Sequence, residues 1–193
     1  MALVLNGSSN TIGGVAVGGL PDGIVDTDML AANAVTSAKA IGRGITALSV
    51  WYLTTSFSGA ANPVVNWAEY SSDGNTTGFG SAMTQSNGIW TFPSTGFWQV
   101  NCQAYGYGSS GTDSYSIFTQ ISTDSGSNYA GAPKRSYSNI PSISGSWYSQ
   151  NQNTMYYDVT NASTTRVKVV VDANPDNIDN GGTFVRFMRL ADT

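Results

Sequence analysis

From Thr46 to the end of the chain, apolar and polar residues alternate along several short runs. Trp98, Val100 and Cys102 are each followed by a polar residue, and the same pattern recurs over residues 115–122, 154–160, 166–172 and 184–190. A period of two turns one face of a strand toward a core and the other toward water or a partner. Since no run of convincing length has helical periodicity, we expect an all-β fold.

Turn-forming residues separate these runs. They occur at Asp73-Gly74-Asn75, Pro93 to Gly96, Gly106 to Gly111, Asp124-Ser125-Gly126 and Asn174-Pro175-Asp176. Glycine, proline, asparagine and aspartate favour the backbone conformations that tight turns need. About eight to ten strands at this spacing predict a sandwich or jelly roll of roughly 150 residues.

Residues 1–45 have a different composition. They contain no aromatic residue, whereas residues 46–193 contain all 22. A segment without large side chains cannot fill a core alone, so it must lie on something else. We therefore divide the chain into an extended N-terminal arm (1–45) and a jelly-roll head (46–193).

An approximate repeat within this arm begins at Val25 and again at Val35. Each copy starts with a β-branched residue, continues with small residues of the helix-capping kind and ends in good helix formers. We expect short helical turns that are stabilised when several chains wind together. Val25, Leu30, Val35 and Ile41 are the candidate contact residues of this arm, and a flexible linker is the alternative interpretation.

The residue types argue against catalysis. The sequence contains no histidine, which removes the commonest general base and metal ligand. Only Glu69 among the 12 acidic residues is a glutamate, and nothing in the sequence pairs two acids as a glycosidase requires. Cys102 is the one cysteine, and its alternating strand predicts a small buried hydrophobe. We expect no enzymatic activity and no cofactor.

Charge and hydropathy exclude further partners. The net charge is −4 and no run of Lys or Arg occurs, so nucleic acid is not an expected ligand. No stretch of about 18 apolar residues is present, so we expect no membrane insertion. The first residues also lack the basic start and apolar run of a signal peptide. If the protein is found outside a cell, we expect it to leave by lysis or assembly and not by secretion.

One acidic loop is a candidate ion site. Asp172, Asp176 and Asp179 occur close together with several asparagines, and oxygen ligands of this kind suit calcium. The favoured interpretation is a solvated turn with Asx hydrogen bonds, and we expect no metal.

Aromatic residues beside Gly- and Ser-rich segments are the remaining candidates for ligand binding. Such side chains suit sugar or protein recognition, and packing at a subunit interface or under a loop is the alternative. The six residues are Tyr105, Tyr107, Tyr129, Tyr137, Trp147 and Tyr148.

The stretch from Gly88 to Val100 resembles the jelly-roll heads of the tumour-necrosis-factor and complement-globular-head superfamily. An aromatic strand with Trp90 and Phe92 precedes a turn at Pro93 and Gly96, and Trp98 begins the next strand. The likeness extends over roughly 140 residues, because the paired strands near the C-terminus and the final aromatic strand also fit the family order. It implies a jelly-roll core that contains these aromatic residues.

Residues 23–39 are similar to a segment that recurs in phage fibre and other virion proteins. The shared unit is a polar-capped Leu30-Ala31 followed by Asn33-Ala34-Val35-Thr36 and Ala38-Lys39. Together the two resemblances imply a homotrimeric virion protein that assembles in the host cytoplasm and is exposed on the particle surface. They imply that the arm (1–45) serves virion attachment and trimerisation, with Val25, Leu30, Val35 and Ile41 as the trimer or virion contacts. The arm contacts other capsid or tail proteins, and the head binds a host surface glycan or protein. The alternative is a trimeric capsid decoration protein that stabilises the shell.

Overall fold

The computed structural model describes residues 4–6, 11–13, 44–70, 78–130, 135–173 and 175–193. The chain forms two compact units, residues 1–41 and 42–193. In the first unit, β1 (Val4–Asn6) and β2 (Thr11–Gly13) pair antiparallel. The predicted helical turns, with Val25, Leu30, Val35 and Ile41, lie outside the described residues.

The second unit, the head, is built from eight antiparallel strands. They are β3 (Ala47–Leu53), β4 (Trp67–Glu69), β5 (Thr84–Ser86), β6 (Ile89–Thr91), β7 (Gly96–Ser122), β8 (Ser136–Val159), β9 (Arg166–Ala173) and β10 (Asn177–Ala191). The described residues include no helix, and so none that is long and apolar enough to cross a membrane. The all-β jelly roll predicted from alternation is confirmed.

The strands follow the order β4-β3-β10-β7-β9-β6-β5, and β8 pairs with β7. The first half of β7 pairs with β10 and its second half pairs with β9, while β8 accompanies both halves. Strand β7 bends between these halves, and the packing of its own residues shows this. A Cβ on Gly106 would lie 2.7 Å from the ring of Tyr115. Nine residues of straight strand would separate the two by about 30 Å.

The bend divides the head into two layers. The first layer contains β4, β3, β10, the first half of β7 and the C-terminal half of β8. The second layer contains β5, β6, β9, the second half of β7 and the N-terminal half of β8. Gly106 to Gly111 were predicted as a turn between strands, and this prediction is wrong. The segment stays inside β7 and keeps its pairing with β8 through two register shifts, because glycines let a strand bend sharply without leaving the ladder.

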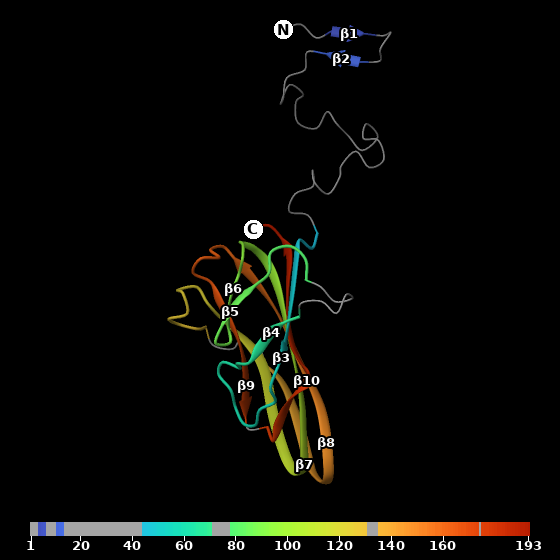
Figure 1. Ribbon diagram of the computed structural model, residues 1–193, viewed down its shortest axis with the longest axis vertical. Helices are drawn as coiled ribbons and strands as arrows, with labels where there is room; N and C mark the ends of the chain where they lie inside the picture. The colour runs from blue at the N-terminus through green and yellow to red at the C-terminus, as the bar shows by residue number, and fades with distance from the viewer. Residues whose placement is uncertain (1–3, 7–10, 14–43, 71–77, 131–134, 174) are drawn as a thin grey trace. The chain divides into compact units, whose positions relative to one another are not determined.

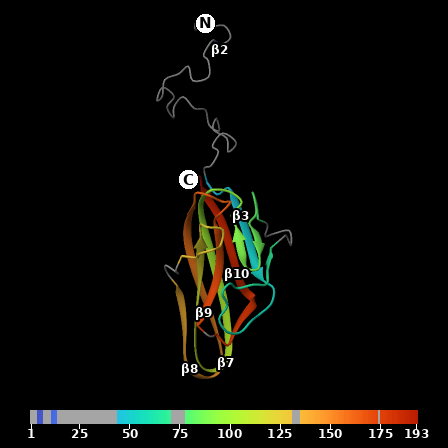
Figure 2. The same cartoon turned by 90° about the vertical axis from the view of Figure 1, so that its left-hand side faces the viewer.

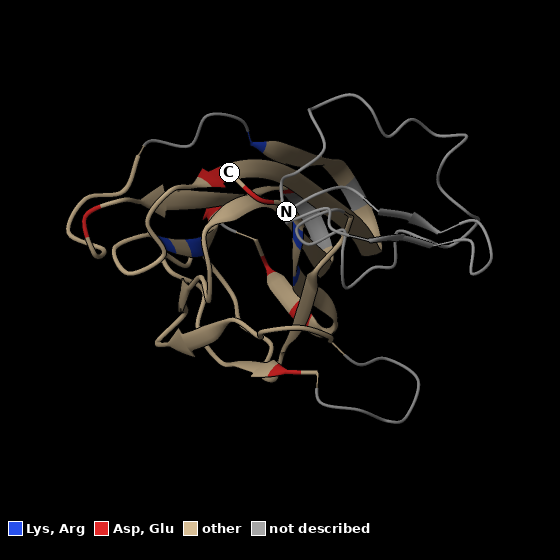
Figure 3. Cartoon of the chain, turned by 90° about the horizontal axis from the view of Figure 1, so that it is seen from above, with Lys and Arg blue, Asp and Glu red and all other residues tan. Residues whose placement is uncertain are grey.

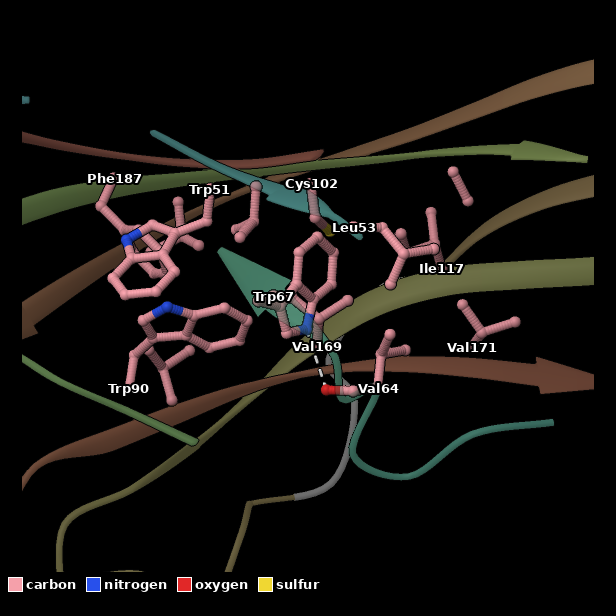
Figure 4. Close-up of a cluster of buried hydrophobic side chains, with 14 of the residues drawn as sticks. Trp51, Leu53, Val64, Trp67, Trp90, Cys102, Ile117, Val169, Val171 and Phe187 are labelled. Carbon is pink, nitrogen blue, oxygen red and sulfur yellow. Dashed lines mark hydrogen bonds between the residues drawn. The ribbon is translucent and has the colours of Figure 1, made fainter. Parts of the chain in front are cut away.

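Large aromatic side chains fill the space between the layers. Trp90 from β6 is fully buried and contacts Trp51, Trp67 and Phe187, whose ring centroids lie 6.1, 5.4 and 5.3 Å from its own (Figure 4). Phe92 is also buried, with its ring 5.3 Å from that of Trp98. These contacts join both layers into one core.

The turn between β6 and β7 is built by Pro93 to Gly96. Pro93 is exposed, and the indole N–H of Trp98 donates to the Ser94 carbonyl at 3.2 Å. Gly96 has a φ of +137°, and a Cβ there would lie 2.6 Å from the Ala191 carbonyl oxygen. Only glycine fits this position without strain.

The head has two distinguishable ends. At one end Thr46, just before β3, donates its N–H to the Arg189 carbonyl, and the C-terminus lies there too (Figure 1). At the opposite end β7 and β8 bend between the layers (Figure 2). The start of β3 is therefore remote from this bend, which we call the corner of the head.

Candidate functional site

Five of the six aromatic candidates lie in strands, and Tyr129 lies between β7 and β8. Tyr105 and Tyr107 belong to β7, and Tyr137, Trp147 and Tyr148 belong to β8. Tyr137 and Tyr148 are 63% and 67% exposed, whereas Trp147 is only 5% exposed. Trp147 is thus a core residue and not a ligand-facing one, because the pleat of β8 turns it inward while its neighbour Tyr148 turns outward.

The pairing register of β7 and β8 brings three of these tyrosines together. Tyr107 lies opposite Tyr148 in the β7–β8 ladder. The rings of Tyr105 and Tyr148 are stacked, with centroids 6.1 Å apart and planes inclined by 18°. Beside them is a cavity of about 480 Å³, which we call the corner pocket. It is lined by Tyr107, Gly108, Ser109, Ser146, Tyr148, Asp176 and Asn177.

Gly108 is required by the packing at this corner. A Cβ there would lie 2.3 Å from Oδ2 of Asp176 and 2.4 Å from the indole nitrogen of Trp147. Any side chain would displace both groups. The indole N–H of Trp147 is buried and has no hydrogen-bond partner among the described residues.

The backbone, and not the side chain, fixes Asp176 in place. Its N–H donates to the Asp113 carboxylate at 2.8 Å, while its own carboxylate accepts no hydrogen bond within the part of the chain that the structure describes. Asp176 therefore presents an exposed, uncommitted acceptor to the corner pocket.

Two carboxylates of the acidic loop bind groups of the chain itself. Asp172 pairs with Arg135, and Asp179 accepts the N–H of Gly181. The N–H of Ala173 and then the Arg135 guanidinium hold the pKa of the Asp172 carboxyl below its usual value. Among the described residues no three potential ligands come together. The solvated-turn interpretation fits these bonds.

Packing accounts for two further residues considered in the sequence, Tyr129 and Cys102. Lys168 lies over the Tyr129 ring at 4.0 Å, which occupies that ring in a cation–π contact. Cys102 is fully buried, and burial raises the pKa of its thiol to about 12, so the thiol stays protonated and unreactive near neutral pH.

A second surface, which sequence reasoning did not single out, is the outer face of the first layer. Its side chains form cross-strand rows of aromatic, aliphatic and amide groups. The rows are Tyr156-Gln99-Met188-Leu48, Thr154-Asn101-Arg186-Val50 and Gln152-Gln103-Phe184-Tyr52. Tyr156 and Tyr52 are 65% and 39% exposed, so apolar rings reach the surface here.

The centre of this outer face is hollowed and incompletely bonded. A cavity of about 160 Å³ lies there between Asn101, Arg186 and their neighbours. The amide nitrogen of Asn101 donates to Thr154 at 2.7 Å, but its buried side-chain oxygen has no hydrogen-bond partner among the described residues. A buried acceptor of this kind is costly unless something else supplies a donor.

The β7–β8 ribbon also lacks charge. Residues 96–112 and 136–157 contain no Lys, Arg, Asp or Glu. Figure 3 shows charged positions as a few scattered segments on the head. Among the described strands, β8 pairs only with β7, so its other edge has no partner strand there along its 24 residues. Monomeric proteins usually protect long edges with charges, and this edge has none over most of its length.

Comparisons with known proteins support the fold. No family model and no curated protein matches the chain. Among solved structures it resembles an Eiger TNF from S. frugiperda, with 14% identity, a TM-score of 0.60, and 78% of this chain and 96% of that chain covered. It also resembles murine APRIL at pH 5.0, with 14% identity, a TM-score of 0.54, and 75% and 98% covered.

The head therefore has a TNF-like jelly-roll fold. This confirms the fold implied by Gly88 to Val100. Similarity at this identity bears on architecture alone, since one fold supports many functions.

Proposed function

We propose that this chain is a non-enzymatic structural protein of a bacteriophage particle. It assembles as a homotrimer, docks on the virion through its N-terminal segment and presents the jelly-roll head to the host surface. The segment at residues 23–39, which is similar to phage fibre proteins, supports the virion role. The absence of histidine from the sequence supports a binding or scaffolding role over a catalytic one.

The outer face of the first layer carries the self-association. It combines exposed rings, an unbonded Asn101 oxygen and a long uncharged edge strand. Interfaces are enriched in tyrosine, phenylalanine, methionine and arginine, and these rows contain Tyr52, Tyr156, Phe184, Met188 and Arg186. In a closed threefold ring each copy buries this face against a different surface of the next copy, so every copy covers its neighbour.

Three copies are proposed because both resemblances point to trimers. The TNF-like head accords with a threefold head, and the fibre-like segment accords with three arms wound together. The polarity of the head fits an appendage, because β3, its first strand, begins at one end and β7 and β8 bend at the other (Figures 1 and 2). The pocket residues Tyr107 and Tyr148 belong to the bent part of β7 and β8.

The self-association is tested with a charged residue in the outer face. Tyr156→Lys places an ammonium group among apolar rows, so we expect lighter species in solution. The control Thr123→Lys adds the same charge in an exposed loop and should keep the wild-type mass. If both variants keep that mass, the outer face is not the interface.

The virion role is tested by labelling intact particles with antibodies against the head. Label at the tail or at fibre tips is the expected result. Label spread evenly over the shell would instead support the capsid decoration protein. Particles without label would contradict both virion roles.

A further inference from the structure

We propose that the corner pocket is a binding site for a neutral saccharide. This inference rests on the proposed function and narrows its host-surface ligand to one chemical class. The pocket volume of about 480 Å³ falls in the range of roughly 300–1,000 Å³ typical of small-ligand sites. A protein partner would need about 800 Å² of surface on each side, far more than this cavity offers.

The stacked tyrosines provide a preformed platform. Tyr148 is 67% exposed, yet its ring is held nearly parallel to that of Tyr105. A fixed ring loses little conformational entropy when a ligand packs on it. The C–H face of a pyranose ring is flat and apolar, and tyrosine offers a flat apolar face with a polar edge.

Polar groups around this platform are free to bind hydroxyls. The Asp176 carboxylate and the side chains of Asn177 and Ser146 line the pocket, and none makes a hydrogen bond to another described residue. Neighbouring sugar hydroxyls can donate to a carboxylate and accept from an amide at the same time. Hydrogen bonds to an ionised carboxylate are stronger than neutral ones.

Charge selects against acidic sugars. Of the described residues that line the pocket, none is Lys or Arg, and Asp176 is joined to a second acid, Asp113. A sialic or uronic acid would bring a third carboxylate to this corner with no cation to offset it. The favoured ligand is therefore uncharged.

The chain builds this pocket through a specific glycine. Gly108 leaves room for the Asp176 carboxylate and for the Trp147 indole, which both lie against it. Because Trp147 is buried and Tyr148 is exposed, one dipeptide of β8 supplies both the support and the platform.

The test uses the purified full chain and saturation-transfer NMR. The neutral probes are the methyl glycosides of glucose, galactose, mannose and N-acetylglucosamine. The acidic probes are glucuronic acid and N-acetylneuraminic acid. Tyr148→Ala removes the platform, and Tyr137→Ala is the matched control, since that tyrosine is 63% exposed on the same strand but does not line the pocket.

We expect at least one neutral glycoside to receive saturation, with no effect of EDTA. Tyr148→Ala should weaken binding at least about tenfold and Tyr137→Ala should leave it unchanged. Asp176→Asn should weaken neutral binding and admit the acidic probes. The proposal is overturned if no neutral probe binds, if acidic probes bind better, if both tyrosine variants lose binding equally, or if EDTA abolishes it.

These outcomes separate the two proposals. If no sugar binds while particles carry the protein and Tyr148→Ala particles still attach to cells, the saccharide site fails and the appendage role stands. If the sugar binds but particles lack the protein, the virion role fails and the site stands.

Discussion

Two core tryptophans differ in one hydrogen bond, and this difference predicts unequal stability effects. The indole N–H of Trp67 donates to the Val64 carbonyl at 2.9 Å. The indole N–H of Trp90 is buried without a partner among the described residues. Replacing either residue with phenylalanine removes similar apolar area, so the burial losses largely cancel when the two variants are compared.

The remaining difference comes from the N–H groups. Trp67→Phe leaves the Val64 carbonyl without its bond, at a cost of about 1–3 kcal/mol. Trp90→Phe removes a buried N–H that already lacks a partner in the wild-type protein, so the substitution breaks no hydrogen bond among the described residues. Trp90→Phe should therefore reduce the free energy of unfolding by ~2 kcal/mol less than Trp67→Phe does.

The assay is equilibrium unfolding in urea at one fixed protein concentration, because assembly makes stability depend on concentration. Trp90→Ala sets the scale, since it should cost ~3–5 kcal/mol by emptying the centre of the core. If Trp90→Phe proves as destabilising as Trp67→Phe, the unpartnered N–H is not a real feature of the core.

Three further variants test local interactions. The Ser122 hydroxyl is the main cause of the lowered pKa of Asp124, about 2, so Ser122→Ala should raise that pKa toward 3.8 in an NMR titration; an unchanged pKa would contradict this. The Cys102 thiol has a pKa raised by burial, so unfolding free energy should fall as pH rises from about 9 toward 12, and Cys102→Ala should flatten that fall in urea titrations. Gly88 has a φ of +76° and a Cβ there would lie 2.1 Å from the Val64 carbonyl oxygen, so Gly88→Ala should cost at least ~1–2 kcal/mol; a melting temperature equal to that of wild type would refute the constraint.

Local pattern was sufficient to predict the strands and much of the core. Trp98 and its alternating neighbours lie inward as the period of two requires, and the Pro93 to Gly96 turn is present. The bend inside β7 was not predictable, because Gly106 to Gly111 have the composition of an ordinary turn. Whether such a segment ends a strand or bends it depends on its partner, and β8 continues the pairing there.

The corner pocket was likewise not predictable from local sequence. Tyr107 and Tyr148 were candidates in the sequence, but 40 intervening residues separate them and only the β7–β8 register places them opposite each other. Asp176 was considered for a cation and lies instead beside Gly108. Trp147 and Tyr148 are adjacent and differ in exposure because register, not composition, decides which one faces the core.

The central claim is that the outer face of the first layer is covered by other copies of the chain. The most direct test is the mass of the purified chain in solution, measured by light scattering over a dilution series. We predict a stable species of three times the 20.3 kDa of one chain. A species of 20.3 kDa at all concentrations would contradict the trimer and the role proposed for this face.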